Sequence, residues 1–421
     1  MFEKLTLANG LRVVLEEIPF VRSISFGIWV KNGSRNETIS ENGLSHFIEH
    51  MLFKGTENRT AKEIADEMDA IGGQLNAYTT KEYTAYYTRV LDDHFDIALD
   101  IFADMFFHSN FDEAEIEKER NVIFEEINMY EDSPEELVHE SIQSAVWEND
   151  SLGYSILGTE ETISAFSRQS FLDYCEKHYC PENTVIAIAG NFKKADILKR
   201  IEKYFAGFQR SADYHAPVFH TDYKTAIVTK EKDIEQLHLC LSFPGIGIGT
   251  ADAYTLSALN TLFGGGMSSR LFQNIREDKG LVYSIYSYAA NHTGTGLFAI
   301  YAALNPAQCS DAMALIIDEI KKIRTEKVDD KTLRNTKEQL KSNYMLGLES
   351  SSNRMSNIGR SELLLGRILS DDESIDKIEA VTKDDVHGLC GRIFDLNRLS
   401  LSAVGRTQGM DFERMIRDAG K

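Results

Sequence analysis

The first predicted amphipathic helix of this 421-residue chain, over 44–53, brings two histidines and a glutamate close together. It lies in the stretch Gly43-Leu-Ser-His-Phe-Ile-Glu-His-Met-Leu-Phe-Lys-Gly-Thr56. At 3.6 residues per turn, His46 and His50 share one face of that helix, where two imidazoles can hold one metal ion. Glu49 lies close to the same face, and a carboxylate there can take a proton from a water molecule that the metal activates. This pattern indicates a zinc site.

A catalytic zinc site needs a third protein ligand and one open position. The candidate segment is a glutamate-rich helix expected over 112–130. Glu119 and Glu126 are two turns apart and share a face, so one could bind the metal while the other orients it. Taken alone, such a helix is more often a solvated face. Spacing alone does not choose among the candidates Glu115, Glu119, Glu125 and Glu126.

The elements around this stretch recur in the second half of the chain. In the first half, Asn9-Gly10 between apolar runs predicts a hairpin. A strand, two helices, two strands and two helices are then expected near 23–31, 44–53, 61–71, 74–79, 83–91, 93–107 and 112–130. The same order is expected near 236–243, 256–262, 269–278, 281–289, 295–303, 313–320 and 330–348. A repeat of roughly 200 residues indicates a domain duplication rather than a solenoid.

We therefore expect an α+β fold of two homologous domains, each a mainly antiparallel sheet packed with helices. The first domain is expected over 1–212 and the second over 223–421. The linker is expected at about 210–222, where Ser, Ala, Asp, His and Pro cluster without a period.

The charge, the cysteine content and the N-terminal sequence limit the partners and the location that we expect for this chain. The net charge of −21 disfavours nucleic acid and anionic membranes as partners, and fits either basic peptides or a general adaptation to the medium. Five cysteines without a Cys-x-x-Cys pair argue against a disulfide framework and a cysteine zinc site. The N-terminus lacks a signal-peptide pattern, and no apolar stretch reaches membrane-spanning length. We expect a cytoplasmic location, with an organelle matrix as the alternative for a matured import product.

The region from Gly43 to Ser133 resembles the pitrilysin and mitochondrial-processing-peptidase family, the inverzincin metallopeptidases. The resemblance rests on the His-x-x-Glu-His stretch, on Gly-Gly-Gln-Leu-Asn-Ala-Tyr-Thr over 72–79 and on Glu-Arg-Asn-Val-Ile-Phe-Glu-Glu-Ile over 119–127. It extends across both halves and points to the shorter branch of separate subunits, the bacterial-type processing proteases. It implies one Zn²⁺ per chain, with metal ligands His46, His50 and Glu126, general base Glu49 and a supporting Glu119.

The resemblance also implies residues that act on the substrate. Asn76 and Ala77 lie on an expected strand and would contact an extended peptide, although Asn at a strand end is common for turn reasons. Arg276 and Tyr283, in the second half, would donate hydrogen bonds to the oxyanion of a tetrahedral intermediate. The alternative for this pair is an ordinary surface Arg and a packed Tyr.

The second half lacks a His-x-x-Glu-His motif, so one chain carries one metal site. By resemblance, the two domains face each other as a half-clamshell, and two chains pair as a homodimer or a heterodimer. The expected function is that of a zinc-dependent metalloendopeptidase, which hydrolyses peptides or unfolded segments in an enclosed chamber. The alternatives are a non-catalytic scaffold or regulatory subunit and a purely structural zinc site. Scaffold members have broken motifs, whereas every motif position is filled here.

Overall fold

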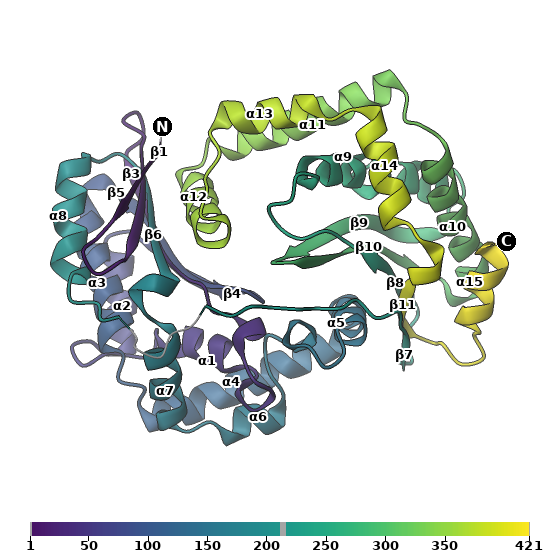
Figure 1. Cartoon of the computed structure of the whole chain (residues 1–421). Coiled ribbons are helices and arrows are strands. Elements are labelled where there is room, and N and C mark those ends of the chain that lie inside the picture. The colour runs from purple at the N-terminus through teal and green to yellow at the C-terminus, as the bar shows by residue number, and fades with distance from the viewer. Residues whose placement is uncertain (1, 211–215, 421) are drawn as a thin grey trace. The chain divides into compact units, whose positions relative to one another are not determined.

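The computed structural model describes residues 2–210 and 216–420, so the expected linker lies partly outside the described residues. The chain divides into two compact units, each built on one sheet (Figure 1). The first unit consists of Met1–Asn128, Tyr154–Val218 and Met345–Ser370, and the second of Met129–Gly153, Phe219–Tyr344 and Asp371–Lys421. Within the described ranges, no helix combines the length and apolarity needed to cross a membrane.

The sheet of the first unit has six strands in the order β1-β2-β6-β3-β5-β4. Only the β2–β6 pair is parallel. The central strands are buried along their whole length because helices cover both faces. Strand β6 is mainly apolar, whereas β3 begins with serines that alternate with Ile24 and Phe26. The strands are β1 (Phe2–Thr6), β2 (Arg12–Glu17), β3 (Ser23–Val30), β4 (Gln74–Thr79), β5 (Thr84–Leu91) and β6 (Thr184–Gly190).

One face of this sheet carries the helices that hold the candidate site. Phe26 of β3 packs edge-on against Phe102 of α3, with ring centroids 5.3 Å apart. Phe47 of α1 packs on Phe171 of α7 at 4.9 Å, which fixes the helix that bears the histidine pair. The helices assigned wholly to the first unit are α1 (Leu44–Met51), α2 (Ala61–Ala70), α3 (Phe95–His108), α6 (Glu160–Ala165), α7 (Arg168–His178), α8 (Lys194–Phe205) and α12 (Ser351–Leu365), and α4 (Glu113–Asp132) begins there.

The second unit repeats this plan with five strands in the order β7-β11-β8-β10-β9, of which only β7–β11 is parallel. This order matches β2-β6-β3-β5-β4 strand for strand, which confirms an α+β fold with one mainly antiparallel sheet per unit. The strands are β7 (Ile227–Glu231), β8 (Leu237–Pro244), β9 (Val282–His292), β10 (Thr295–Leu304) and β11 (Ser400–Gly405). Its helices are α5 (Pro134–Val146), α9 (Ala253–Gly264), α10 (Cys309–Thr325), α11 (Asp330–Gly347, whose last turn belongs to the first unit), α13 (Asp371–Ala380), α14 (Lys383–Ile393) and α15 (Phe412–Gly420).

The two units exchange one helix each. Helix α12 belongs to the first unit, where Met355 and Ile358 join the buried cluster of Trp29. Helix α5 belongs to the second unit, where Val138 and Ile142 cover the face of the sheet opposite α9 and α10. The compact units are therefore interleaved along the chain, whereas the domains expected at 1–212 and 223–421 are continuous. Sequence order does not reveal this, because either sheet can bury an amphipathic helix.

Within 23–130 and 236–348, where elements were expected, local structure follows the sequence expectations closely, with one difference in helix type. The helix expected over 269–278 is a π-helix over Phe272–Glu277, labelled η6. Such wide turns are rare and are frequently found at functional sites.

Candidate metal centre

The start of helix α1 is fixed by a glycine in the left-handed conformation and by a buried carboxylate. Its N-cap, Gly43, has φ +95°, and a Cβ there would stand 2.8 Å from the Gly158 Cα, so only glycine fits without strain. The buried Glu37 carboxylate accepts hydrogen bonds from the backbone N–H groups of Gly43 and Ser45, both at 2.8 Å. A carboxylate at a helix N-terminus satisfies free N–H groups and the helix dipole.

The structure brings His46, His50 and Glu126 together. The two Nε2 atoms are 3.1 Å apart, and each is 3.7 Å from Oε2 of Glu126. Among the described residues, these three form the group whose ligand atoms all lie within 4.8 Å of one another. Ligand atoms around a tetrahedral zinc, at about 2.0–2.1 Å from it, stand roughly 3.3 Å apart. The observed spacings of 3.1 and 3.7 Å bracket that value, so the residues fit zinc.

A second carboxylate fixes the ring of His50. Its Nδ1 lies 2.8 Å from Oε1 of Glu119, and Lys54 Nζ lies 2.6 Å from the other oxygen. Because a carboxylate only accepts, Nδ1 carries the proton and Nε2 keeps its lone pair for a metal. His46 has no such support, since its buried Nδ1 has no hydrogen-bond partner among the described residues.

The electrostatics favour a bound cation. Burial lowers the pKa of His46 to about 3, which keeps its ring in the neutral form that binds metals. Burial also disfavours charge on His50, but the hydrogen bond with Glu119 and the nearby Glu126 outweigh it, and its pKa is raised. The site therefore favours positive charge beside its carboxylates, and a divalent ion supplies that charge.

Glu49 stands beside the triad in a defined orientation. Its Oε2 accepts a hydrogen bond of 2.5 Å from Oγ1 of Thr79, the last residue of β4. Burial raises its pKa, and the bond from Thr79 opposes that rise. A carboxylate with a raised pKa is a better proton acceptor at neutral pH than an ordinary glutamate.

The predicted substrate residues Asn76 and Ala77 lie on β4, an edge strand paired with β5 alone. The Asn76 side chain accepts a hydrogen bond of 2.8 Å from the Ala77 backbone N–H. A free edge can take up an extended peptide as a further strand. Substrate binding at these residues stays a prediction.

Arg276 and Tyr283 belong to the second unit. Arg276 lies on η6, with its guanidinium 4.6 Å from the Phe272 ring centroid. Tyr283 lies near the start of β9 and is 72% exposed. The structure places them on consecutive elements of one unit, and their action on the metal centre stays a prediction.

Three site residues were not predicted from sequence. Thr79 ends the quoted Asn-Ala-Tyr-Thr run, and Lys54 follows His50 by four residues, so spacing could have suggested both. The role of Glu37 could not be predicted from sequence, because it precedes α1 by several residues and reaches the start of that helix only through the fold of the loop between them. Of the four open candidates for the third ligand, the structure brings Glu126 to the histidines and Glu119 behind His50.

Comparisons with known proteins agree with this geometry. Residues 12–160 match the model of the insulinase family, peptidase family M16, and residues 165–340 match the M16 inactive domain. The chain is 46% identical over 397 residues to an uncharacterized zinc protease of Bacillus subtilis, YmxG, covering 94% of this chain and 96% of the relative. A zinc protease of Streptomyces coelicolor, also uncharacterized, is 37% identical, with 97% and 91% covered.

Two solved structures share the fold. A protease from Helicobacter pylori has a TM-score of 0.89 at 22% identity, covering 96% of this chain and 99% of that one. A peptidase M16 inactive domain from Pseudomonas fluorescens has a TM-score of 0.91 at 18% identity, covering 98% and 99%. At these identities the structural likeness concerns the fold alone.

Proposed function

Because this chain belongs to the insulinase family of peptidases, M16, we propose that it is a zinc-dependent metalloendopeptidase. Its substrates are peptides or unfolded protein segments, cut at internal bonds. The observation that carries the proposal is the convergence of His46, His50 and Glu126, with Glu49 held beside them by Thr79. A structural site would close its shell with a fourth ligand and would leave Glu49 without a role.

The residues of the centre have distinct tasks. His46, His50 and Glu126 would hold the ion, and Glu119 orients His50. One zinc per chain supplies Lewis-acid activation of water and of the scissile carbonyl. Glu49 accepts a proton from the attacking water and later gives it to the leaving amine. Thr79 holds the Glu49 carboxylate in place through its hydroxyl.

Substrate contacts come from both halves of the sequence. An extended peptide pairs with the free edge of β4, along Asn76 and Ala77, which gives affinity without demanding one sequence. Arg276 and Tyr283 donate hydrogen bonds to the developing oxyanion, in keeping with the exposed phenol of Tyr283.

The proposal extends to the charge of the substrate, the location of the enzyme and its assembly. The net charge of −21 favours basic peptides and disfavours nucleic acid and membrane surfaces. We propose a cytoplasmic enzyme that works in an enclosed chamber and pairs as a homodimer, because one chain carries both the metal-binding half and the Arg276–Tyr283 half.

The test is cleavage of unstructured basic and acidic peptides, followed by mass spectrometry, with and without a zinc chelator. We expect internal cuts that chelation abolishes and that Glu49→Gln reduces by about 10²–10⁴-fold while zinc stays bound. Glu125→Gln, on the exposed side of α4, is the matched control and should cut normally. Zinc binding without any cleavage by the native chain would instead favour the scaffold alternative.

A further inference from the structure

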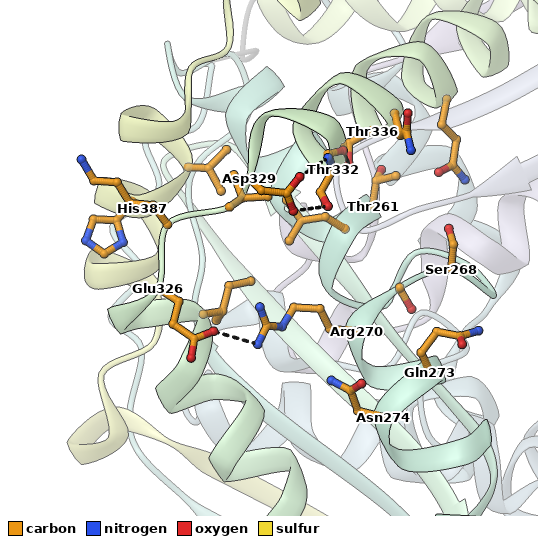
Figure 2. A pocket seen from close by; sticks show the side chains of 18 residues that line it. Thr261, Ser268, Arg270, Gln273, Asn274, Glu326, Asp329, Thr332, Thr336 and His387 are labelled. Carbon is orange, nitrogen blue, oxygen red and sulfur yellow. Dashed lines mark hydrogen bonds and ion pairs between the residues drawn. The ribbon is translucent and has the colours of Figure 1, made fainter. Parts of the chain in front are cut away.

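The second unit contains a polar cavity of about 570 Å³, lined by residues of α9, η6 and α11 (Figure 2). Its lining lies within 261–339 and 386–387, ranges that both belong to the second unit, so the cavity belongs to this unit alone. The volume falls in the range of roughly 300–1,000 Å³ that is typical of ligand sites. The metal centre, in the first unit, uses none of its residues.

The charged groups of the cavity already have partners inside the protein. Arg270 donates from Nε to the buried Glu319 at 3.0 Å, and its Nη2 lies 3.6 Å from Glu326 (Figure 2). Lys327 lies 2.6 Å from Asp384. Both cations are therefore ion-paired, and the remaining carboxylate, Asp329, accepts hydrogen bonds from the backbone N–H of Lys331 and the hydroxyl of Thr332, so the cavity offers no unpaired cation to a small inorganic anion.

Among the neutral polar groups, one buried hydroxyl has no partner in the described part of the chain, and Asn335 and Gln339 are exposed. Ser269 is only 2% exposed, and its Oγ has no hydrogen-bond partner among the described residues. The side-chain amides of Asn274, Asn335 and Gln339 also line the cavity. No hydrogen bond of these amides is found within 2–210 and 216–420. Buried polar groups are nearly always bonded, so Ser269 requires a partner that enters the cavity.

The cavity contains the counterpart of the Glu119 position, whereas the counterpart of the metal ligand Glu126 is Asn343, which lies outside it. Asp112 caps α4 through Ala114 N, and Asp329 caps α11 through Lys331 N in the same way. Counting seven residues from each cap pairs Glu119 (112 + 7) with Thr336 (329 + 7), which lines the cavity. In the second unit a neutral hydroxyl, that of Thr336, thus stands at the position where the first unit has the Glu119 carboxylate.

The lining determines the class of ligand. It contains no Phe, Tyr or Trp, so the imidazole of His387 is its one aromatic ring on which a nucleobase or sugar could stack. Side-chain amides offer donors and acceptors together, and their natural complement is another amide. We propose that this cavity binds the main chain of a short uncharged peptide segment through Ser269, Asn274, Asn335 and Gln339. The choice of peptide among amide ligands rests on the proposed function.

The probe is a trialanine peptide that is acetylated and amidated, and so has no charge. Its dissociation constant is measured by saturation-transfer NMR with and without a zinc chelator, on the full-length Glu49→Gln protein, in which any cleavage is slowed by about 10²–10⁴-fold. The test variant adds Asn335→Leu and Gln339→Leu, both exposed on α11, which should fold normally. The matched control adds Asn343→Leu, exposed on the same helix but outside the cavity.

We expect binding that survives chelation, is unchanged in the control, and weakens about tenfold in the test variant because two hydrogen-bonding side chains are lost. Equal affinity in the test variant and the control would overturn the proposal. Loss of binding on chelation would place the peptide at the metal centre instead, and absence of binding would also refute the cavity site. Chelator-sensitive cleavage by the native chain tests the proposed function separately.

Discussion

Glu119 shows how one residue serves a metal centre without binding the metal. Its carboxylate accepts a hydrogen bond of 2.8 Å from His50 Nδ1 and is paired with Lys54 at 2.6 Å. The contact fixes both the tautomer and the ring orientation of His50, and partners of this kind tune metal affinity. The Nδ1 atom of His46 lacks such a partner among the described residues, so within the pair only His50 is oriented by a carboxylate.

Replacing Glu119 by Gln should weaken zinc binding about 10–100-fold, because the amide is a poorer acceptor and leaves Lys54 unpaired. The measurement is competition for zinc against a chelating dye at pH 7.5. Glu117→Gln, on the same helix and exposed, is the control and should keep the native affinity. An unchanged affinity in Glu119→Gln would remove Glu119 from the metal centre.

At the scale of elements, helix α12 packs so closely that one position accepts only glycine. A Cβ on Gly359 would stand 2.8 Å from Cε3 of Trp29, which is fully buried. Glycine inside a helix costs about 1 kcal/mol relative to alanine, yet the close approach requires it here. The close packing of α12 on this face of the sheet therefore depends on the absence of a side chain at Gly359.

Gly359→Ala should lower the free energy of unfolding by about 1–3 kcal/mol, since overpacking against Trp29 outweighs the gain in helix propensity. Gly388→Ala in α14 is the control, because nothing lies within 4 Å of its added Cβ. There the propensity gain stands alone and should stabilise by up to about 1 kcal/mol. Urea unfolding followed by tryptophan fluorescence measures both, and a stabilising Gly359→Ala would contradict the packing argument.

Helix α5 is fastened to its sheet by polar contacts. His139 lies 3.0 Å from the Tyr286 hydroxyl through Nε2 and 2.8 Å from the Tyr288 hydroxyl through Nδ1. Tyr286 in turn donates to Glu135 at 2.8 Å. Burial lowers the pKa of His139 to about 4, and the nearby Glu135 only partly opposes this.

This pKa makes stability depend on pH. Between pH 6.5 and about 4, the unfolded chain holds a proton on His139 that the folded chain lacks, so stability falls as the pH falls through this window. The loss amounts to about 2–3 kcal/mol. His139→Gln should remove that part of the acid sensitivity, and the exposed His220→Gln should not. Urea unfolding at pH 7.5 and 4.5 measures it, and parallel losses in both variants would refute the assignment.

At the scale of the whole molecule, the exchange of α5 and α12 ties the two halves of the sequence together. The chain passes between units after residues 128, 153, 218, 344 and 370. Each sheet is therefore covered in part by a helix from the other half of the sequence, α12 in the first unit and α5 in the second. A fragment cut at the expected linker would expose the apolar surface around Trp29 or around Tyr301.

We expect fragments 1–212 and 213–421 to be poorly soluble when expressed separately and to co-purify when expressed together. Appending 345–370 to the first fragment through a flexible linker should restore its solubility, because it returns the missing helix. Size-exclusion chromatography and circular dichroism measure the outcome. Two separately soluble fragments with native melting temperatures would show that the exchanged helices contribute little.

The sequence by itself determined the local features of this protein. Helical spacing put His46, Glu49 and His50 on one face, and the Asn9-Gly10 turn, the duplication and the elements expected within 23–130 and 236–348 followed from short-range patterns. Such features depend on backbone periodicity and turn chemistry, which neighbouring residues control.

The tertiary structure decided which distant residues meet. Spacing left four glutamates open as the third ligand, and only the packing of α4 beside α1 brings Glu126 to the histidines. The hydrogen bond from Thr79 to Glu49 depends on the position of β4, and the cap by Glu37 depends on the fold of the preceding loop. The exchange of α5 and α12 was likewise invisible, because an amphipathic helix shows that it has an apolar face but not which sheet that face will cover.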